Sequence, residues 1–389
     1  MSQPLVAHET PTLLIRGARV IDPAQQIDQI ADIAVSGDKV VGIGHYPAAI
    51  GATVIDATGC VASPGWIDLH AHVYAAAGIN GVHADRDAGI ATGVTTVVDA
   101  GTTGAGNWAA FREAVIDVAT TRVLAYLNIS LRPITGPRHG EWSNFNQGQT
   151  IALAEREAAA GCCLGIKVLA SQTHCGNLGI TPVKLARQAA RLSGTGLMVH
   201  IGNAPPVIED VLELLGEGDI VTHCWHGKVG GLLGRDRKPS AATLAAVARG
   251  VKFDIGHGSA SFAFATARPA LEAGLPLHAI STDLHQGCLH GPAYDMGTTM
   301  AKFLHLGLPL PEVIRLSTWS PAQLMGRADE LGTLQSGRTA DITIFRVIDG
   351  EFPLTDSERQ TEIGRQQLEV YYTVRAGQVV KTPTTTAVL

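Results

Sequence analysis

The sequence lacks the cysteine spacing of a thiolate metal site. Its six cysteines include no CxxC pair, so a zinc ribbon is not expected. Several of them fall within or beside apolar, strand-like segments, where a reduced cysteine behaves as a small hydrophobic side chain. The six are Cys60, Cys162, Cys163, Cys175, Cys224 and Cys288.

Charged residues and long apolar runs are also scarce. Only 16% of the residues are charged, the formal net charge is −6, and no long run of Lys or Arg occurs. We therefore expect no binding to nucleic acids or anionic membranes. No stretch of about 18 apolar residues could span a membrane, and the opening MSQPLVAHETP has neither the basic nor the apolar region of a signal peptide. We expect a cytoplasmic protein, for which a homo-oligomer would be ordinary.

Hydrophobic residues (46%) and glycine (44 residues) are abundant, which suits a large core with many tight turns. Short strand-like segments lie at both ends of the chain. They include LLIRGARVIDP and DIAVSGDKVVGIG near the N-terminus, and ADITIFRVI and VYYTVRAGQVVK near the C-terminus. Ser-Gly-Asp and Ala-Gly are turn signals between such strands. We predict a small β-sandwich domain built from residues 1–62 and 331–389, with two unrelated β appendages as the alternative.

The long middle of the chain, residues 63–330, alternates eight times between a strand-like and a helix-like segment. Its strands are apolar throughout, as in WIDLHAH and LMVHIG, which is typical of a parallel sheet covered on its outer face. The pattern predicts an α/β fold, a (β/α)8 TIM barrel. An open doubly wound sheet is the alternative, but no GxGxxG motif follows the first strand.

Six polar residues lie at or near the ends of these strands. They are His70, His72, Lys167, His200, His223 and Asp283. The active sites of barrels form where the carboxyl ends of the strands converge on one face. The i, i+2 spacing of His70 and His72 puts both imidazoles on one side of a strand, where they can bind one metal ion. A pair of surface or core histidines is the other interpretation of this motif.

Lys167 stands among the apolar residues of CLGIKVLA, where a charge is costly unless it is paired, solvated or chemically altered. One interpretation is a snorkelling or ion-paired lysine. The other is a carbamylated lysine, because a buried neutral amine can capture CO₂ and the carbamate can bridge two cations. His200 and His223 could each be core histidines, and Asp283 could cap a helix. All six positions in register on the strands favour two metal sites over six separate structural roles.

At these residues the chain resembles the amidohydrolase superfamily, in its branch with two metal ions and a carbamylated lysine. GWIDLHAH, GTLQSGRTADITIF and the order of the ligands along the chain are similar to that superfamily's sequences. The resemblance implies one divalent ion bound by His70, His72 and Asp283. It implies a second ion bound by His200 and His223.

The resemblance also implies a mechanism. N6-carboxylysine at Lys167 and a hydroxide would bridge the two ions. The hydroxide forms at neutral pH because metal coordination lowers the pKa of water. The hydroxide attacks a polarised carbonyl, and Asp283 passes the proton to the leaving group. Imidazole and oxygen ligands make Zn²⁺ the expected metal, although they also suit Mn²⁺, Fe²⁺ and Co²⁺.

Residues beyond the ligands bear on the substrate. Dihydroorotases of this superfamily usually carry an arginine two residues after the HxH motif, and this chain has Tyr74 there. Arg132 could bind a carboxylate through two hydrogen bonds. Asn203, His257 and Tyr294 fall in loops of the expected active face. Each of these four candidate substrate contacts also has a structural interpretation.

The whole pattern resembles the dihydroorotase-like deacetylases, which implies a small-molecule substrate, an N-acetyl amino acid or an acetylated 2-hydroxy acid. The alternatives are hydrolysis of a cyclic amide, as in dihydroorotases and hydantoinases, and a non-catalytic barrel that acts as an assembly partner. A deaminase with one metal ion would not need Lys167. Residues 132–150 are rich in Gly, Pro, Asn and Gln and predict a long loop, either a lid or surface decoration.

Overall fold

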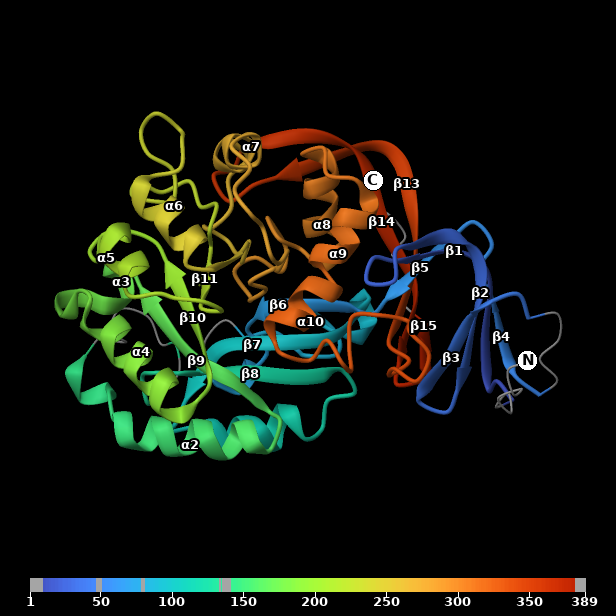
Figure 1. Cartoon of the computed structure of the whole chain (residues 1–389), viewed down its shortest axis with the longest axis horizontal. Coiled ribbons are helices and arrows are strands. Elements are labelled where there is room, and N and C mark those ends of the chain that lie inside the picture. The colour runs from blue at the N-terminus through green and yellow to red at the C-terminus, as the bar shows by residue number, and fades with distance from the viewer. Residues whose placement is uncertain (1–9, 47–50, 78–80, 133, 135–140, 382–389) are drawn as a thin grey trace, which may run out of the picture.

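The computed structural model describes residues 10–46, 51–77, 81–132, 134 and 141–381, and it contains two sheets (Figure 1). The larger part is a parallel sheet curled into a barrel and covered by helices, and the smaller part is a mixed sheet from both ends of the chain. The barrel strands lie side by side in sequence order and are β6 (Trp66–Ala71), β7 (Val94–Gly104), β8 (Arg122–Asn128), β9 (Cys163–Ala170), β10 (Gly196–Ile201), β11 (Ile220–Thr222) and β12 (Lys252–Asp254).

An irregular segment, residues 277–285, takes the place of the eighth barrel strand. It makes single parallel bridges to β6 through Leu284 and to β12 through Ala279. The Asp283 amide also donates to the carbonyl of His70 (2.6 Å). The segment therefore closes the barrel, and the predicted fold is confirmed. A regular eighth strand does not form, because Asp283 adopts a φ of +46°, which interrupts the extended backbone.

Helices follow most of the strands. They are α1 (Trp108–Phe111), α2 (Gln147–Ala159), α3 (Gln172–Cys175), α4 (Thr181–Ser193), α5 (Ile208–Glu213), α6 (Ala241–Ala248), α7 (Phe264–Glu272), α8 (Met296–His305), α9 (Leu310–Leu316) and α10 (Trp319–Leu324). Between β6 and β7, residues 84–93 form turns and a short 3-10 helix (Ile90–Thr92) instead of an α-helix. The Asp85 carboxylate accepts hydrogen bonds from the amides of Thr120 and Thr121, which ties this segment to the start of β8 rather than to a helical turn.

The barrel interior has an apolar floor and a polar rim, because alternate strand residues point inward. One buried cluster fills the floor and includes Ile67, Leu69, Val98, Leu124, Tyr126, Met198 and Ile220. Further along the strands, the inward positions carry Lys167, His200, Thr222 and Asp254. The functional groups thus stand on a rigid apolar base at the carboxyl ends of the strands.

The strands from the two ends of the chain join in one mixed sheet (Figure 1). They are β1 (Leu13–Asp22), β2 (Ile27–Ser36), β3 (Lys39–Gly44), β4 (Thr53–Asp56), β5 (Val61–Pro64), β13 (Ile342–Thr355), β14 (Thr361–Arg375) and β15 (Gln378–Lys381). The order is β15-β14-β13-β5-β1-β2-β3, with β4 paired to β1. A unit shared by both termini is confirmed, and its strands form one continuous sheet. The boundaries 1–62, 63–330 and 331–389 stay a prediction.

All six cysteines are free, and five of them are buried, which agrees with their role as small apolar side chains. Within the described residues, the helices are too short or too polar to cross a membrane.

Candidate metal centre

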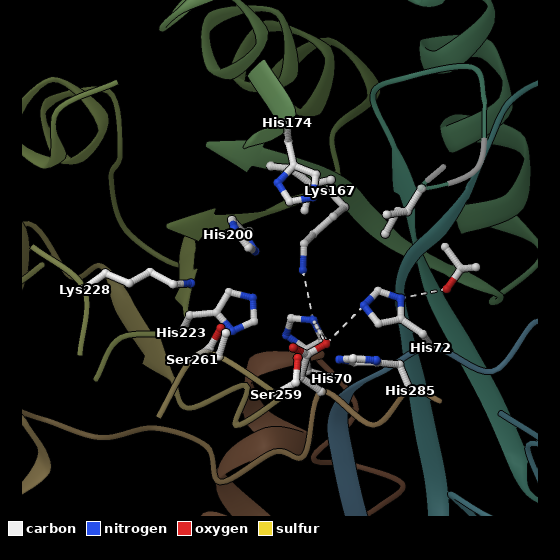
Figure 2. Close-up of a pocket in the computed structure, with 15 residues that line it drawn as sticks. His70, His72, Lys167, His174, His200, His223, Lys228, Ser259, Ser261 and His285 are labelled. Carbon is white, nitrogen blue, oxygen red and sulfur yellow. Dashed lines mark hydrogen bonds and ion pairs between the residues drawn. The ribbon is translucent and has the colours of Figure 1, made fainter. Parts of the chain in front are cut away.

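A cavity of about 270 Å³ opens at the carboxyl ends of the barrel strands, and all six predicted ligands line it. Three of these side chains belong to the strands β6, β9 and β10. Two others directly follow β6 and β11, and Asp283 belongs to the irregular segment 277–285. Figure 2 shows the imidazoles and the lysine pointing toward one another across this space. The structure thus brings together residues that lie far apart in the sequence.

His70, His72 and Asp283 are in direct contact. Oδ1 of Asp283 lies 3.4 Å from Nε2 of His70 and 3.1 Å from Nε2 of His72. Both histidines therefore turn the same nitrogen toward one carboxylate oxygen, as the i, i+2 spacing predicts. Two imidazole nitrogens and a carboxylate oxygen form a ligand set suited to a divalent ion.

Hydrogen bonds to the opposite ring nitrogens determine which nitrogen faces the cavity. The hydroxyl of Thr222 donates to Oδ2 of Asp254 (2.7 Å), so its oxygen accepts from Nδ1 of His70 (2.7 Å). Nδ1 of His223 donates to the carbonyl of Gly256 (2.6 Å), which can only accept. Because Nδ1 carries the proton in both rings, Nε2 offers its lone pair to the cavity.

Burial keeps the imidazoles of His70, His200 and His223 neutral. It lowers the pKa of each well below its usual range, and neighbouring histidines and Lys167 lower it further. The ring centre of His200 lies 4.4 Å from that of His223 and 5.3 Å from that of His174. Neutral imidazole is the form that binds metal ions.

Lys167 is fully buried on β9, with Nζ 3.3 Å from Nε2 of His70 and 3.5 Å from Sδ of Met198. Burial lowers the pKa of its amine to about 8, although the Asp283 carboxylate opposes this shift. Gly101 permits the close approach of β7, because a Cβ there would lie 2.6 Å from Cβ of Lys167. Part of the amine is therefore uncharged near neutral pH, the form that carbamylation requires.

Asp68 and Gly258 hold Asp283 in place. The buried Asp68 carboxylate accepts from the Thr282 amide (3.0 Å) and hydroxyl (2.5 Å). Asp283 and His223 both have left-handed backbones, with φ of +46° and +67°, which are costly for residues other than glycine. A Cβ on Gly258 would lie 2.2 Å from Oδ2 of Asp283. The surrounding structure therefore enforces a strained but defined orientation of both side chains.

The donor set fits a divalent metal ion. The ligand atoms of His70, His223 and Asp283 all lie within 4.8 Å of one another. Neutral imidazoles and a carboxylate oxygen are ligands that zinc and similar ions prefer. His72 and His200 line the same cavity, so it contains more donors than one four-coordinate ion uses.

None of the four predicted substrate contacts lines this cavity. Arg132 and Asn203 are exposed, and Tyr294 is 45% exposed; their substrate roles stay predictions. His257 is fully buried, with Nε2 2.7 Å from Nζ of Lys302 and Nδ1 2.9 Å from the next residue's carbonyl. Both ring nitrogens have partners within the protein, and a substrate role for His257 stays a prediction.

The predicted loop 132–150 is only partly covered, since 133 and 135–140 lie outside the described residues. Ile134 lines the cavity, and Asn146 ends the loop by capping α2, with its side chain accepting from the Gln149 amide (3.1 Å). The loop therefore reaches the cavity, and its action as a lid stays a prediction.

Several polar residues of the cavity were not predicted from the sequence. They are Thr102, His174, Lys228, Ser259, Ser261 and His285. His285 follows Asp283 at the same i, i+2 spacing as His72 follows His70, which is a signal that could have identified it. Lys228 lies in a glycine-rich loop after β11, where no periodicity indicates the direction of a side chain.

Known proteins resemble the chain over almost its whole length. A model of the amidohydrolase family matches residues 61–380, which include all six predicted ligands. A deacetylase of Agrobacterium fabrum is 35% identical over 353 residues, which cover 90% of this chain and 86% of that protein. Two solved structures are also similar. One, described as an adenine deaminase, has a TM-score of 0.88 and 34% identity, covering 96% of this chain and 100% of that one. The other, described as a dihydroorotase, has a TM-score of 0.86 and 32% identity, covering 96% and 98%.

Proposed function

The chain belongs to the amidohydrolase family and is a hydrolase, and we propose that it deacetylates small substrates that carry a carboxylate. N-acetyl amino acids and acetylated 2-hydroxy acids are the candidate substrates. The observation that carries the proposal is the convergence of His70, His223 and Asp283 in one cavity. The similarity to a deacetylase over 90% of the chain supports the choice of reaction.

Two divalent ions, with zinc as the expected metal, would occupy the cavity. His70, His72 and Asp283 would hold one ion, and His200 and His223 would hold the other. The buried lysine of β9, carboxylated on Nζ, would lie between these two groups, since its amine is 3.3 Å from the first. When bound, such ions lower the pKa of water and polarise an acyl carbonyl.

The protein's own groups would orient the reactants and move the proton. Asp283 faces the histidines through Oδ1 and would accept a proton from the attacking water. It would then pass this proton to the leaving nitrogen or oxygen. The hydrogen-bonded chain from Asp254 through Thr222 keeps the ring of His70 from turning during this transfer.

Hydrolysis of a cyclic amide is the second candidate, because a structure described as a dihydroorotase is 32% identical over nearly all of the chain. Tyr74 argues against it. The position where dihydroorotases usually carry an arginine holds a tyrosine that is 8% exposed and packs on Phe111, with ring centres 5.3 Å apart. This side chain lies outside the cavity that the predicted ligands line and provides no cation for a carboxylate.

Metal analysis and a substrate panel test the proposal together. The purified protein should contain close to two equivalents of metal per chain. The zinc-loaded protein should release acetate from D- or L-N-acetyl amino acids or from acetylated 2-hydroxy acids, and should act more slowly on cyclic amides. A protein without metal, or one that turns over cyclic amides alone, would contradict deacetylation. A cytoplasmic location and a homo-oligomer stay predictions.

A further inference from the structure

Lys228 is a second cation in the cavity, and the chemistry of the metal centre does not use it. It belongs to the loop after β11 and lines the cavity together with the histidines. Figure 2 shows its side chain extending from that loop toward His200 and His223. In the described part of the chain, no ion pair joins its ammonium to a carboxylate.

The charge of Lys228 acts inside the cavity. Its side chain is half-buried and lines the same cavity as His200 and His223. Burial lowers the pKa of Lys228 itself, while the more distant carboxylates of Asp283 and Glu358 raise it. The ammonium is therefore partly desolvated and lacks a direct counter-ion, and an anion that enters the cavity would be attracted strongly.

We propose that Lys228 determines specificity by binding the carboxylate of the substrate. The inference rests on the proposed function, because it supplies the carboxylate site that deacetylation of an N-acetyl amino acid needs. The other cations are placed differently, since Lys167 belongs to the metal centre and Arg132 is exposed outside the cavity. A charge-assisted hydrogen bond to Lys228 would fix one end of the substrate, while its acyl carbonyl faces Asp283.

A turn of the terminal sheet borders this site. Residues 356–360 join β13 to β14, and the hydroxyl of Ser357 donates to the carbonyls of His257 (3.1 Å) and Gly258 (3.2 Å). Glu358 of the same turn lines a second hollow, and Lys228 lines both this hollow and the cavity of the metal centre. Its carboxylate competes with a substrate carboxylate for the ammonium. Glu358→Gln should therefore lower the KM for carboxylate substrates about two- to threefold.

The experiment compares Lys228→Met with Lys238→Met, an exposed lysine of the same loop, in metal-loaded protein. The probes are N-acetylalanine and N-acetylalaninamide, each as both enantiomers, which differ only in the carboxylate. Lys228→Met should raise the KM for N-acetylalanine about 10- to 100-fold and leave the amide within about twofold. Lys228→Arg should keep most of the preference for the carboxylate, and Lys238→Met should change neither substrate.

Calorimetry with lactate and lactamide gives a second measurement that does not depend on turnover. Wild type should bind lactate more tightly than lactamide, and Lys228→Met should abolish the difference. Equal losses for carboxylate and amide would overturn the role of Lys228 and leave the proposed function standing. Failure of wild type to hydrolyse any acetylated substrate would instead overturn the proposed function, and the lactate preference would still decide the role of Lys228.

Discussion

Two buried lysines in the same barrel have similar local chemistry. Lys167 and Lys302 are both fully buried. Nζ of Lys167 lies 3.3 Å from Nε2 of His70, and Nζ of Lys302 lies 2.7 Å from Nε2 of His257. Burial lowers the pKa of the two amines to about 8 and about 7. Burial and pKa alone would therefore assign the two residues the same role.

Their surroundings separate them. Lys302 on α8 also donates to the carbonyl of Pro292 (2.7 Å), and its partner His257 stacks on Phe262 with ring centres 4.8 Å apart. Lys167 instead faces a cavity of about 270 Å³ that contains further ligand atoms. CO₂ or a metal ion can reach Lys167, whereas the described partners of Lys302 are protein atoms. A candidate metal ligand is therefore distinguished from a structural amine by its access to a cavity and by further ligand atoms nearby, more than by a shifted pKa.

The largest expected effect comes from Lys167→Ala. It should lower kcat/KM about 10³-fold or more and reduce the bound metal toward one equivalent, because the group between the two ion sites is lost. Elemental analysis and steady-state kinetics measure both effects.

A ¹³C NMR spectrum tests directly whether Lys167, and not Lys302, carries a carbamate. ¹³C-bicarbonate should label one carbamate in wild type and in Lys302→Met, and none in Lys167→Ala. An active Lys167→Ala protein with two metal equivalents would give Lys167 the same structural role as Lys302.

Gly258→Ala tests the boundary between the metal centre and the surroundings of Lys302, because Gly258 contacts Asp283 on one side and His257 on the other. Its carbonyl accepts from Nδ1 of His257 (2.9 Å), and a Cβ there would lie 2.2 Å from Oδ2 of Asp283. The substitution should lower kcat/KM about 10- to 100-fold and weaken metal binding, as for the loss of a group that orients a ligand. Gly274→Ala is the matched control, since Gly274 has a φ of +67° and nothing within 4 Å of an added Cβ.

Both alanine variants should lose about 1 kcal/mol of unfolding free energy through their left-handed backbones. Only Gly258→Ala should lose metal affinity. Equal activity in the two variants would mean that Asp283 can shift without consequence.

The ligands could be predicted from the sequence because topology decides their position. An apolar run followed by a histidine, as in LMVHIG, gives the strand and its carboxyl end, and a parallel barrel brings such ends together. His257 in DIGHGS shows the same pattern, but it does not line the cavity. Its ring is buried outside the cavity, where Nε2 accepts a hydrogen bond from Nζ of Lys302, 45 residues further along the chain. A contact between residues so far apart in the sequence cannot be predicted from the residues around His257.

The eighth strand and Lys228 show the same limit. LHAISTDLH predicts a strand, but the buried Asp68 and the left-handed backbone of Asp283 bend this segment out of regular pairing. The direction of Lys228 depends on the path of a glycine-rich loop and on the turn at Glu358, which comes from the other sheet. Neither the path nor the turn can be derived from spacing.

Lys302→Met should lower the free energy of unfolding by about 1–3 kcal/mol and leave metal content unchanged, because His257 and the Pro292 carbonyl lose a donor. The loss should grow with pH. The folded amine has a pKa of about 7 and the unfolded amine one of 10.5, so between these values the unfolded state binds more protons. Wild type then gains up to about 1.4 kcal/mol per pH unit, and methionine gains nothing.

Urea unfolding of both proteins at several pH values between 6.5 and 8.5 measures this difference. A gap between wild type and Lys302→Met that stays constant with pH would show that the amine of Lys302 does not titrate as an isolated buried group. The two lysines would then differ only in that Lys167 lines the cavity and Lys302 does not.

The smallest effect is expected for Arg132→Met. The exposed guanidinium lies outside the cavity, so water and salt screen it, and the KM for N-acetylalanine should change less than about twofold. Whatever change occurs should vanish at about 0.5 M salt, whereas the effect of Lys228→Met should largely persist because that ammonium is partly buried. A salt-resistant tenfold rise in KM for the carboxylate, with none for the amide, would move the carboxylate site from Lys228 to Arg132. Exposure would then have been the wrong criterion for separating the cations of this barrel.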